Sequence, residues 1–183
     1  MTNWKRQLVG QSDLMELGDQ LRGRRKKIVF TAGSWDLIHA GQCRYLEECK
    51  KLGDILVVGV VSDRAISKIK GPNKPILGEK VRAEVLTYLR AVDFVTIVPE
   101  PSCQPSLGLL KPNTYITVKE DWASDYKNSK EYKTVTKYGG EVLVVDRQSS
   151  KISTSQIIAR AIGGSLSDML KDFMQYRKSP LKE

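Results

Sequence analysis

Five short apolar runs rich in β-branched residues recur along the chain, and they constrain its fold more than any other feature. The runs are KIVFTAG from Lys27, ILVVGVVSD from Ile55, DFVTIV from Asp93, TYITV from Thr114 and EVLVVD from Glu141. Between them, apolar residues recur every three or four positions, as in amphipathic helices. Strands that are apolar throughout and alternate with helices are typical of a parallel sheet covered on both faces. The pattern predicts a single doubly wound α/β domain with a five-stranded parallel sheet.

Helical periodicity extends beyond the strand region at both ends of the chain. Leucines recur at residues 14, 17 and 21, and apolar residues recur between residues 166 and 173. We expect an N-terminal helix and basic linker over residues 1–26, the α/β domain over 27–163, and a C-terminal helix and tail over 164–183. Each terminal helix could pack on the core or against a second subunit, so a homodimer is one of two open alternatives.

The charge balance of the chain points to an anionic partner. With 30 basic and 21 acidic residues, the 183-residue chain has a formal net charge of +9. Such a charge suits nucleic acid, an acidic membrane surface or phosphorylated small molecules. Outside the run at residues 24–27, basic residues are mixed with acidic ones, which argues against a dedicated nucleic-acid-binding protein. No apolar run could span a membrane and the N-terminus lacks the apolar core of a signal peptide, so we expect a cytoplasmic protein with no membrane partner.

The cysteines favour reduced thiols. The chain contains three of them, Cys43, Cys49 and Cys103. Their spacing is not that of a zinc site, and their odd number does not suit a disulfide framework. We therefore expect no metal ion held by the protein's own ligands.

The end of the first strand is the first candidate site. In an open parallel sheet, ligands bind at the carboxyl ends of the strands, where the strand order reverses. The first strand ends at Thr31 to Ser34, and the next helix begins near His39, the single histidine of the chain. A turn that leads into a helix N-terminus offers backbone N–H groups that attract phosphate. At this position His39 would face a phosphate; the alternative is a histidine that caps the helix or packs in the core.

Six sequence blocks occur together and in a fixed order. They are TAGSWDLIHAG, YLEECKKLGDILVVGVVSD, KIKGPNKPI, RAVDFV, YGGEVLVVD and ISTSQII. From residue 30 to about residue 162 the chain resembles the cytidylyltransferase-like nucleotidyltransferases, whose signature after the first strand is histidine, any residue, glycine, histidine. Within that family it is most similar to heptose-phosphate adenylyltransferases and glycerol-phosphate cytidylyltransferases. The resemblance implies a Rossmann-like sheet in which the five strands have the order 3-2-1-4-5.

The resemblance also implies a reaction. A nucleotidyl group would move from ATP or CTP to a small phosphorylated sugar or polyol, with release of pyrophosphate, and Mg²⁺ would arrive with the nucleoside triphosphate. His39 would contact the triphosphate and stabilise charge on the leaving pyrophosphate. Because the acceptor itself attacks the α-phosphorus, the protein needs no nucleophile and works by positioning and electrostatics. The blocks TAGSWDLIHAG and AVD marginally favour ATP and a heptose-like phosphate.

The chain departs from the family at two places. Gln42 stands where the family has its second histidine, and an amide can donate a hydrogen bond but never carries a proton charge. Glu120 and Asp121 stand where relatives have a glycine pair after the residue matching Lys119. The first departure favours slower turnover, with a non-catalytic nucleotide-binding protein as the alternative. The second puts base recognition in doubt, and Trp122 could stack on a base or acceptor or simply cover the core.

The resemblance and the position of the first turn together assign site residues. Residues expected to take part in the transfer are His39, Gln42, Lys70 and Thr154. Residues expected to contact the nucleotide are Ala32, Gly33, Ser34, Trp35, His39, Gly41, Gln42, Lys119, Ser153, Thr154 and Ser155. Residues expected to contact the acceptor are Asp36, Asp63, Lys70, Arg90 and Trp122.

Several of these residues have a structural alternative. Lys70 could lie on a cationic flap over residues 68–74 or on a solvated loop. Asp36 could fix the turn or lie near Mg²⁺. Arg90 could be a helix-end cation that complements the helix dipole. The hydroxyl cluster at residues 153–155 is also a good helix N-cap.

Overall fold

The computed structural model describes residues 7–119, 125–146 and 153–178 of the chain. Residues 1–148 form one compact unit and residues 149–183 form a second. Glu120, Asp121 and Trp122, which the sequence analysis singled out, lie outside the described residues. The domain boundaries expected at residues 26 and 163 stay predictions.

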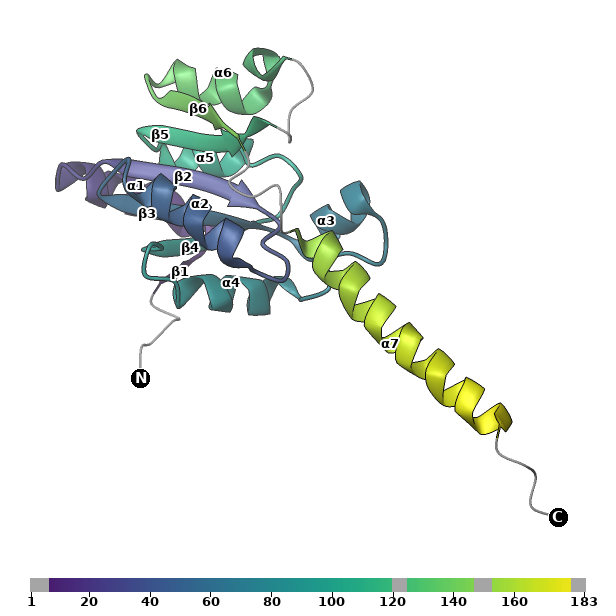
Figure 1. The fold of residues 1–183 in the computed structure, drawn as a ribbon. Helices are drawn as coiled ribbons and strands as arrows, with labels where there is room; N and C mark the ends of the chain where they lie inside the picture. The colour runs from purple at the N-terminus through teal and green to yellow at the C-terminus, as the bar shows by residue number, and fades with distance from the viewer. Residues whose placement is uncertain (1–6, 120–124, 147–152, 179–183) are drawn as a thin grey trace. The chain divides into compact units, whose positions relative to one another are not determined.

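The first unit contains a parallel sheet of six strands (Figure 1). The strands are β1 (Leu8–Val9), β2 (Ile28–Gly33), β3 (Ile55–Val61), β4 (Phe94–Val98), β5 (Thr114–Val118) and β6 (Glu141–Val145). They lie in the order β1-β4-β3-β2-β5-β6. The five predicted strands and their order 3-2-1-4-5 are therefore confirmed.

The predicted number of strands is wrong by one, because β1 adds a sixth strand at the edge. Leu8 pairs with Val95 and Val9 with Thr96 on β4, and Val95 N donates a hydrogen bond to Gln7 O at 2.8 Å. A strand of two residues is too short to show a hydrophobic period. Its pairing depends on β4, a partner more than eighty residues away in sequence.

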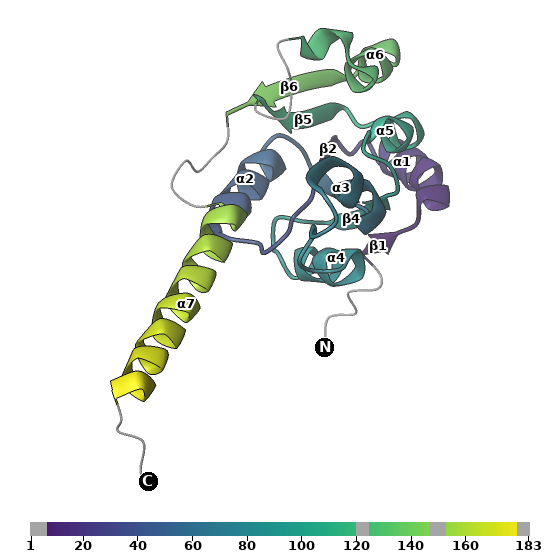
Figure 2. The same cartoon turned by 90° about the vertical axis from the view of Figure 1, so that its right-hand side faces the viewer.

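Helices cover both faces of the sheet, as the sequence predicts. The helices of the first unit are α1 (Leu14–Gly23), α2 (Ala40–Lys50), α3 (Asp63–Lys70), α4 (Glu79–Thr87), α5 (Gln104–Leu110) and α6 (Lys130–Lys137), with short 3-10 turns η2 (Gln11–Asp13) and η4 (Tyr126–Asn128). One buried cluster joins α2 and α4 to the sheet, and the other joins α1, α5 and α6 to its opposite face (Figure 2). Successive β2 residues Ile28 and Val29 enter opposite clusters, as the side-chain alternation of a strand requires.

The N-terminal helix α1 belongs to the core. Leu14 and Leu21 are buried in the cluster that also contains Leu107 and Leu110 of α5. The apolar stripe read from the sequence is therefore covered within the same chain. Of the two alternatives for this helix, packing on the core is the one that the structure shows.

The strand order fixes where a ligand site can form. The chain runs outward from β2 to β3 and β4 on one side, and β5 and β6 fill the other side. The order thus reverses beside β2, so the turn that follows Gly33 lies at a switch point on the carboxyl edge of the sheet. Helix α3 extends from this same edge (Figure 1).

The second unit contains one helix, α7 (Thr154–Lys178). Ser153 caps it: Gln156 N donates to Ser153 Oγ at 3.2 Å, and Ser153 N donates to Gln156 Oε1 at 2.9 Å. This reciprocal pair is a capping box, so the predicted N-cap and C-terminal helix are confirmed. None of the helices in the described part of the chain has the length and apolar character needed to cross a bilayer.

Candidate functional site at the carboxyl edge

The turn after β2 has a strained backbone that the Trp35 side chain holds in place. Trp35 and Leu37 have φ angles of 52° and 47°, in the left-handed region that side chains other than glycine rarely adopt. The Trp35 ring is buried, and its Nε1 donates a hydrogen bond to Gly59 O on β3 at 2.8 Å. A side chain on Gly33 would crowd this ring at about 3.1 Å, so glycine lets the ring fold under the turn. The tryptophan thus ties the turn to the neighbouring strand.

His39 is the N-cap residue of α2. Its carbonyl accepts hydrogen bonds from Gln42 N at 2.9 Å and Cys43 N at 3.1 Å, and its own N–H is bonded to Gln42 Oε1 at 3.2 Å. The imidazole is half-buried, and its Nδ1 has no partner among the residues that the structure describes. The ring therefore stands at the positive end of a helix, with a buried Nδ1 that has no partner among the described residues.

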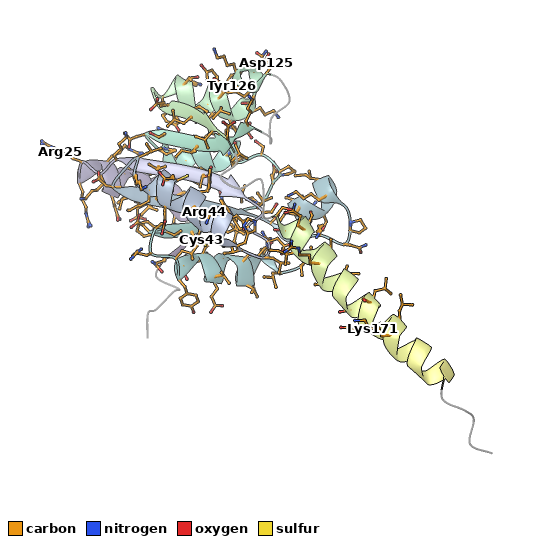
Figure 3. The ribbon with its side chains drawn as sticks, viewed as in Figure 1. Arg25, Cys43, Arg44, Asp125, Tyr126 and Lys171 are labelled. Carbon is orange, nitrogen blue, oxygen red and sulfur yellow. The ribbon has the colours of Figure 1, made fainter. Side chains whose placement is uncertain are left out.

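The electrostatics of the site keep this imidazole neutral. Burial lowers the pKa of His39 below its usual value, and the positive charge of Arg44 on α2 lowers this pKa further (Figure 3). Both effects disfavour the charged form of the ring. At neutral pH His39 is thus a neutral hydrogen-bonding group, until an anion beside it favours protonation.

Gln42 has one amide atom engaged and one available for a ligand. Oε1 accepts from His39 N, which assigns Nε2 as the amide atom that donates. Gln42 thereby forms half of a capping box in the first turn of α2. The residue that replaces the family's second histidine is integrated into the helix N-terminus and keeps a donor.

Lys70 and Ser34 are brought together from separate segments. Lys70 is the last residue of α3, and its Nζ donates to Ser34 Oγ at 3.0 Å. The segment expected to be a loop from residue 68 is therefore helical up to residue 70. Beyond Gly71, Ser67 Oγ donates to Lys74 O at 2.6 Å and holds the following loop against α3. The structure thus places a lysine directly over the turn.

Asp36 anchors the loop between α3 and α4. Its carboxylate is buried and accepts from Ile76 N at 2.8 Å and from Leu77 N at 3.0 Å. Of the two alternatives for Asp36, fixing the turn is the role for which the structure gives contacts. Because the same residue belongs to the turn after β2, these hydrogen bonds tie that turn directly to the loop that follows the lysine-bearing helix.

Asp63 begins α3 and is already paired. Its Oδ1 lies 2.6 Å from Arg82 Nη2 and its Oδ2 accepts from Glu79 N at 3.0 Å, while Asp63 N donates to Glu79 Oε2 at 2.8 Å. These contacts link the starts of α3 and α4. A contact to acceptor hydroxyls stays a prediction for this residue.

Arg82 is a residue of this site that the sequence patterns did not single out. It lies on α4 with its side chain fully buried, next to Asp63. The available signal is its position four residues before Leu86, on the stripe where Ala83 and Leu86 are also buried. A charged residue on a buried stripe needs polar partners inside the protein.

The other predicted positions lie on other elements of the first unit or in the second unit. Arg90 precedes β4 at the amino edge of the sheet, where its side chain is 96% exposed and 4.0 Å from Glu47. Lys119 follows β5, the neighbour of β2, at the carboxyl edge. Thr154 and its flanking serines belong to the second unit, where they form the start of α7. The structure thus brings Ser34, Trp35, His39, Gln42 and Lys70 to one edge but not Arg90.

Cys43, Cys49 and Cys103 are free thiols in the structure. Burial raises the pKa of Cys49 to about 12 and that of Cys103 to about 12. Neither is a thiolate at neutral pH, so neither acts as a nucleophile. Over the described ranges, no three side chains of histidine, cysteine, aspartate or glutamate gather as a metal site would require.

The fold and this edge define the class of the protein. A doubly wound parallel sheet with a helix N-terminus, an imidazole and a lysine at its switch point is typical of α/β domains of the nucleotidyltransferase type. Residues 30–160 match the cytidylyltransferase-like family, and the chain belongs to that family. The resemblance seen in the sequence blocks is therefore confirmed.

Similar proteins include both longer curated proteins and a solved structure. The Bifunctional protein HldE of Syntrophotalea carbinolica is 37% identical over 142 residues, which are 77% of this chain and 28% of that protein. The Bifunctional protein HldE of Hahella chejuensis is 42% identical over 130 residues, 70% of this chain and 26% of that protein. A crystal structure of the lipopolysaccharide core biosynthesis protein from Thermoplasma volcanium is 27% identical with a TM-score of 0.56, covering 70% of this chain and 99% of that chain. The chain thus spans little more than a quarter of the two curated relatives.

Proposed function

We propose that this chain transfers a nucleotidyl group from ATP or CTP to a small phosphorylated sugar or polyol and releases pyrophosphate. Membership of the cytidylyltransferase-like family supports this reaction class. The observation that carries the proposal is the position of His39 at the N-terminus of α2, beside a turn that Lys70 also reaches. A polyanionic triphosphate is the ligand that this combination suits.

In this reaction the residues of the site bind and position rather than attack. An oxygen of the acceptor forms the new bond to the α-phosphorus, and the bond from that phosphorus to the pyrophosphate oxygen breaks. The N-terminus of α2, His39 and Gln42 Nε2 donate hydrogen bonds to phosphate oxygens, and Lys70 supplies positive charge. Such preorganised donors stabilise charge as it moves to the leaving group. Mg²⁺ comes bound to the triphosphate, whose oxygens are its preferred ligands.

We favour ATP and a heptose-like phosphate as substrates. The sequence blocks TAGSWDLIHAG and AVD support this choice. The name of the similar Thermoplasma volcanium protein, a lipopolysaccharide core biosynthesis protein, agrees with a sugar acceptor. We further propose that the protein works in the cytoplasm on small molecules, without nucleic acid or membrane as partners.

A specific observation keeps a second function in view. Gln42 occupies the place of the second motif histidine and uses its Oε1 to cap α2, so the site can bind triphosphate with less capacity to stabilise the leaving group. A non-catalytic nucleotide-binding protein on the same fold would have these properties.

One assay separates the two functions. Pyrophosphate release is measured with ATP and CTP against a panel of heptose, other sugar and polyol phosphates, and nucleotide binding is measured by calorimetry. Turnover on one acceptor class supports the transferase. Tight nucleotide binding with no turnover on any acceptor supports the second function, and no binding of either nucleotide contradicts both.

A further inference from the structure

Arg82 is the most heavily hydrogen-bonded charged residue described at the carboxyl edge of the sheet. Its side chain is 0% exposed. Nε donates to Leu77 O at 2.8 Å, and Nη2 donates to Val61 O at 2.8 Å and to Asp63 Oδ1 at 2.6 Å. Nη1 donates to Ser34 O. The guanidinium thus joins Ser34 in the turn to two other segments.

The partners of Arg82 are mostly backbone carbonyls of segments that diverge from one another. Ser34 follows β2, Val61 ends β3, and Leu77 lies in the loop before α4. A planar guanidinium presents five N–H groups in fixed directions, so it can hold several carbonyls at once. A lysine ammonium is a compact point charge with three donors and cannot reproduce this geometry. The arginine therefore sets how these three segments are spaced.

The hydrogen bond from Arg82 to Ser34 O also fixes the direction of the next backbone N–H group, that of Trp35. The described cis peptide bond is Lys74-Pro75, and the peptide between Ser34 and Trp35 is trans. In a trans peptide the N–H points opposite to the C=O, so holding Ser34 O toward Arg82 turns Trp35 N–H away from it. Within the part of the chain that the structure describes, no acceptor engages Trp35 N–H. A backbone donor is thereby left on the residue that follows Ser34, whose Oγ accepts from Lys70.

The backbone strain in the turn explains why a contact such as that of Arg82 is needed to hold the Ser34–Trp35 peptide. Trp35 adopts a φ of 52°, a conformation that costs of order 1 kcal/mol and persists only where surroundings enforce it. The indole bond to Gly59 O fixes the ring of Trp35, and Arg82 fixes the peptide before it. With both contacts in place the Ser34–Trp35 peptide has one orientation.

We propose that Arg82 is a positioning residue that holds Trp35 N–H as a hydrogen-bond donor for a phosphate oxygen of the nucleotide. The inference rests on the proposed nucleotidyl transfer and adds to it a residue that touches no substrate. Arg82 acts through the Ser34 carbonyl, and its charge is neutralised in part by Asp63. Loss of the guanidinium fork leaves the peptide free to rotate and removes the donor from the phosphate.

The test compares Arg82→Lys with the matched control Arg24→Lys, an exposed arginine between α1 and β2 at the opposite edge of the sheet. Calorimetry measures the Kd of ATP and CTP, and of adenosine and cytidine as phosphate-free probes. We expect Arg82→Lys to weaken triphosphate binding by about tenfold, the scale of one hydrogen bond to a charged group, and to leave nucleoside binding unchanged. Triphosphate binding by Arg82→Lys equal to that by Arg24→Lys overturns the inference. A wild-type chain that binds neither triphosphate instead contradicts the proposed function.

A spectroscopic measurement separates positioning from a general structural role. In ¹⁵N-labelled wild-type protein we expect the Trp35 backbone amide proton to move downfield as ATP saturates the site, and to move less in Arg82→Lys. The indole Nε1 proton of Trp35, bonded to Gly59 O, is the internal control and stays in place. Should Arg82→Lys not fold, the wild-type titration decides alone. A Trp35 amide that does not move while ATP binds overturns the inference.

Discussion

At the scale of single residues, the division of labour between His39 and Gln42 follows from their hydrogen bonds. Gln42 Oε1 is bonded to His39 N, so only the Nε2 donor of Gln42 can face a ligand. An amide can hold a phosphate oxygen but cannot become a cation. In the proposed reaction, stabilisation of the leaving pyrophosphate by charge would therefore fall to His39, when it is protonated beside the anion, and to Lys70.

The His39→Ala variant tests this division. We expect kcat for pyrophosphate release to fall about a hundred-fold, the loss typical of one preorganised donor, with circular dichroism and the melting temperature nearly unchanged. His39→Asn is the control, because asparagine is a good N-cap but has no ring nitrogen in the same place. If His39→Asn keeps full activity while His39→Ala does not, His39 serves only as a cap. An unchanged kcat in His39→Ala contradicts the mechanism.

The pKa of His39 gives a second test at this scale. The chain has one histidine, so a single imidazole signal titrates in the NMR spectrum. Burial, followed by the charge of Arg44, lowers the pKa of His39, so we expect a midpoint below about 6.5, the value for an unperturbed histidine. Because the unfolded chain then binds a proton more readily than the folded chain, stability falls as the pH drops below that value.

Arg44→Ala is the matched variant for the titration. It removes the second cause of the shift, so the His39 pKa should rise toward its usual value without reaching it. Addition of ATP should raise the same pKa, because an anion favours the imidazolium. A midpoint at or above about 6.5 in the free wild-type protein contradicts this account of the site.

At the scale of helices and strands, hydrophobic periodicity predicted the elements whose buried residues are regularly spaced. The runs of β-branched residues predicted β2 to β6, and the regular spacing of leucines predicted α1. Strand β1 was not predicted from the sequence, because it is only two residues long and depends on pairing with β4. Arg82 was missed for a related reason, because its contact with Asp63 forms only when α3 and α4 fold over the same edge. The strand order itself came from resemblance to a family, since periodicity does not specify which strands are neighbours.

The packing of α1 can be tested with a pair of adjacent residues. Leu14 is 0% exposed in the cluster with α5, whereas Met15 is 56% exposed. We expect Leu14→Ala to lower the free energy of unfolding by about 2–5 kcal/mol, because it leaves a cavity. Met15→Ala should change it by less than about 0.5 kcal/mol. Urea unfolding measures both, and equal effects of the two substitutions would contradict the packing of α1 on the core.

At the scale of the whole molecule, the basic run at residues 24–27 and the candidate site lie at different edges of the sheet. The basic run at residues 24–27 joins α1 to β2 and so lies at the amino edge, where Figure 3 labels Arg25. His39 and Lys70 lie at the carboxyl edge. Surface charges separated by more than about 10 Å are largely screened at moderate salt. The net charge of +9 is therefore weak evidence for an anion site at the carboxyl edge. The evidence for that site is the local geometry of the turn after β2.

The division of the chain into two units yields a last prediction. Both core clusters of the sheet are built from residues between Leu8 and Val145, and the apolar residues Ile162, Leu166 and Met169 of α7 are exposed. We therefore expect the fragment 1–148 to fold by itself, with a free energy of unfolding within about 1 kcal/mol of the full chain, because no core contact is removed. A fragment ending at residue 139, which lacks β6, is the control and should unfold. Urea denaturation followed by tryptophan fluorescence compares the three chains, and a 1–148 fragment as unstable as the 1–139 fragment would show that residues 149–183 contribute to the fold.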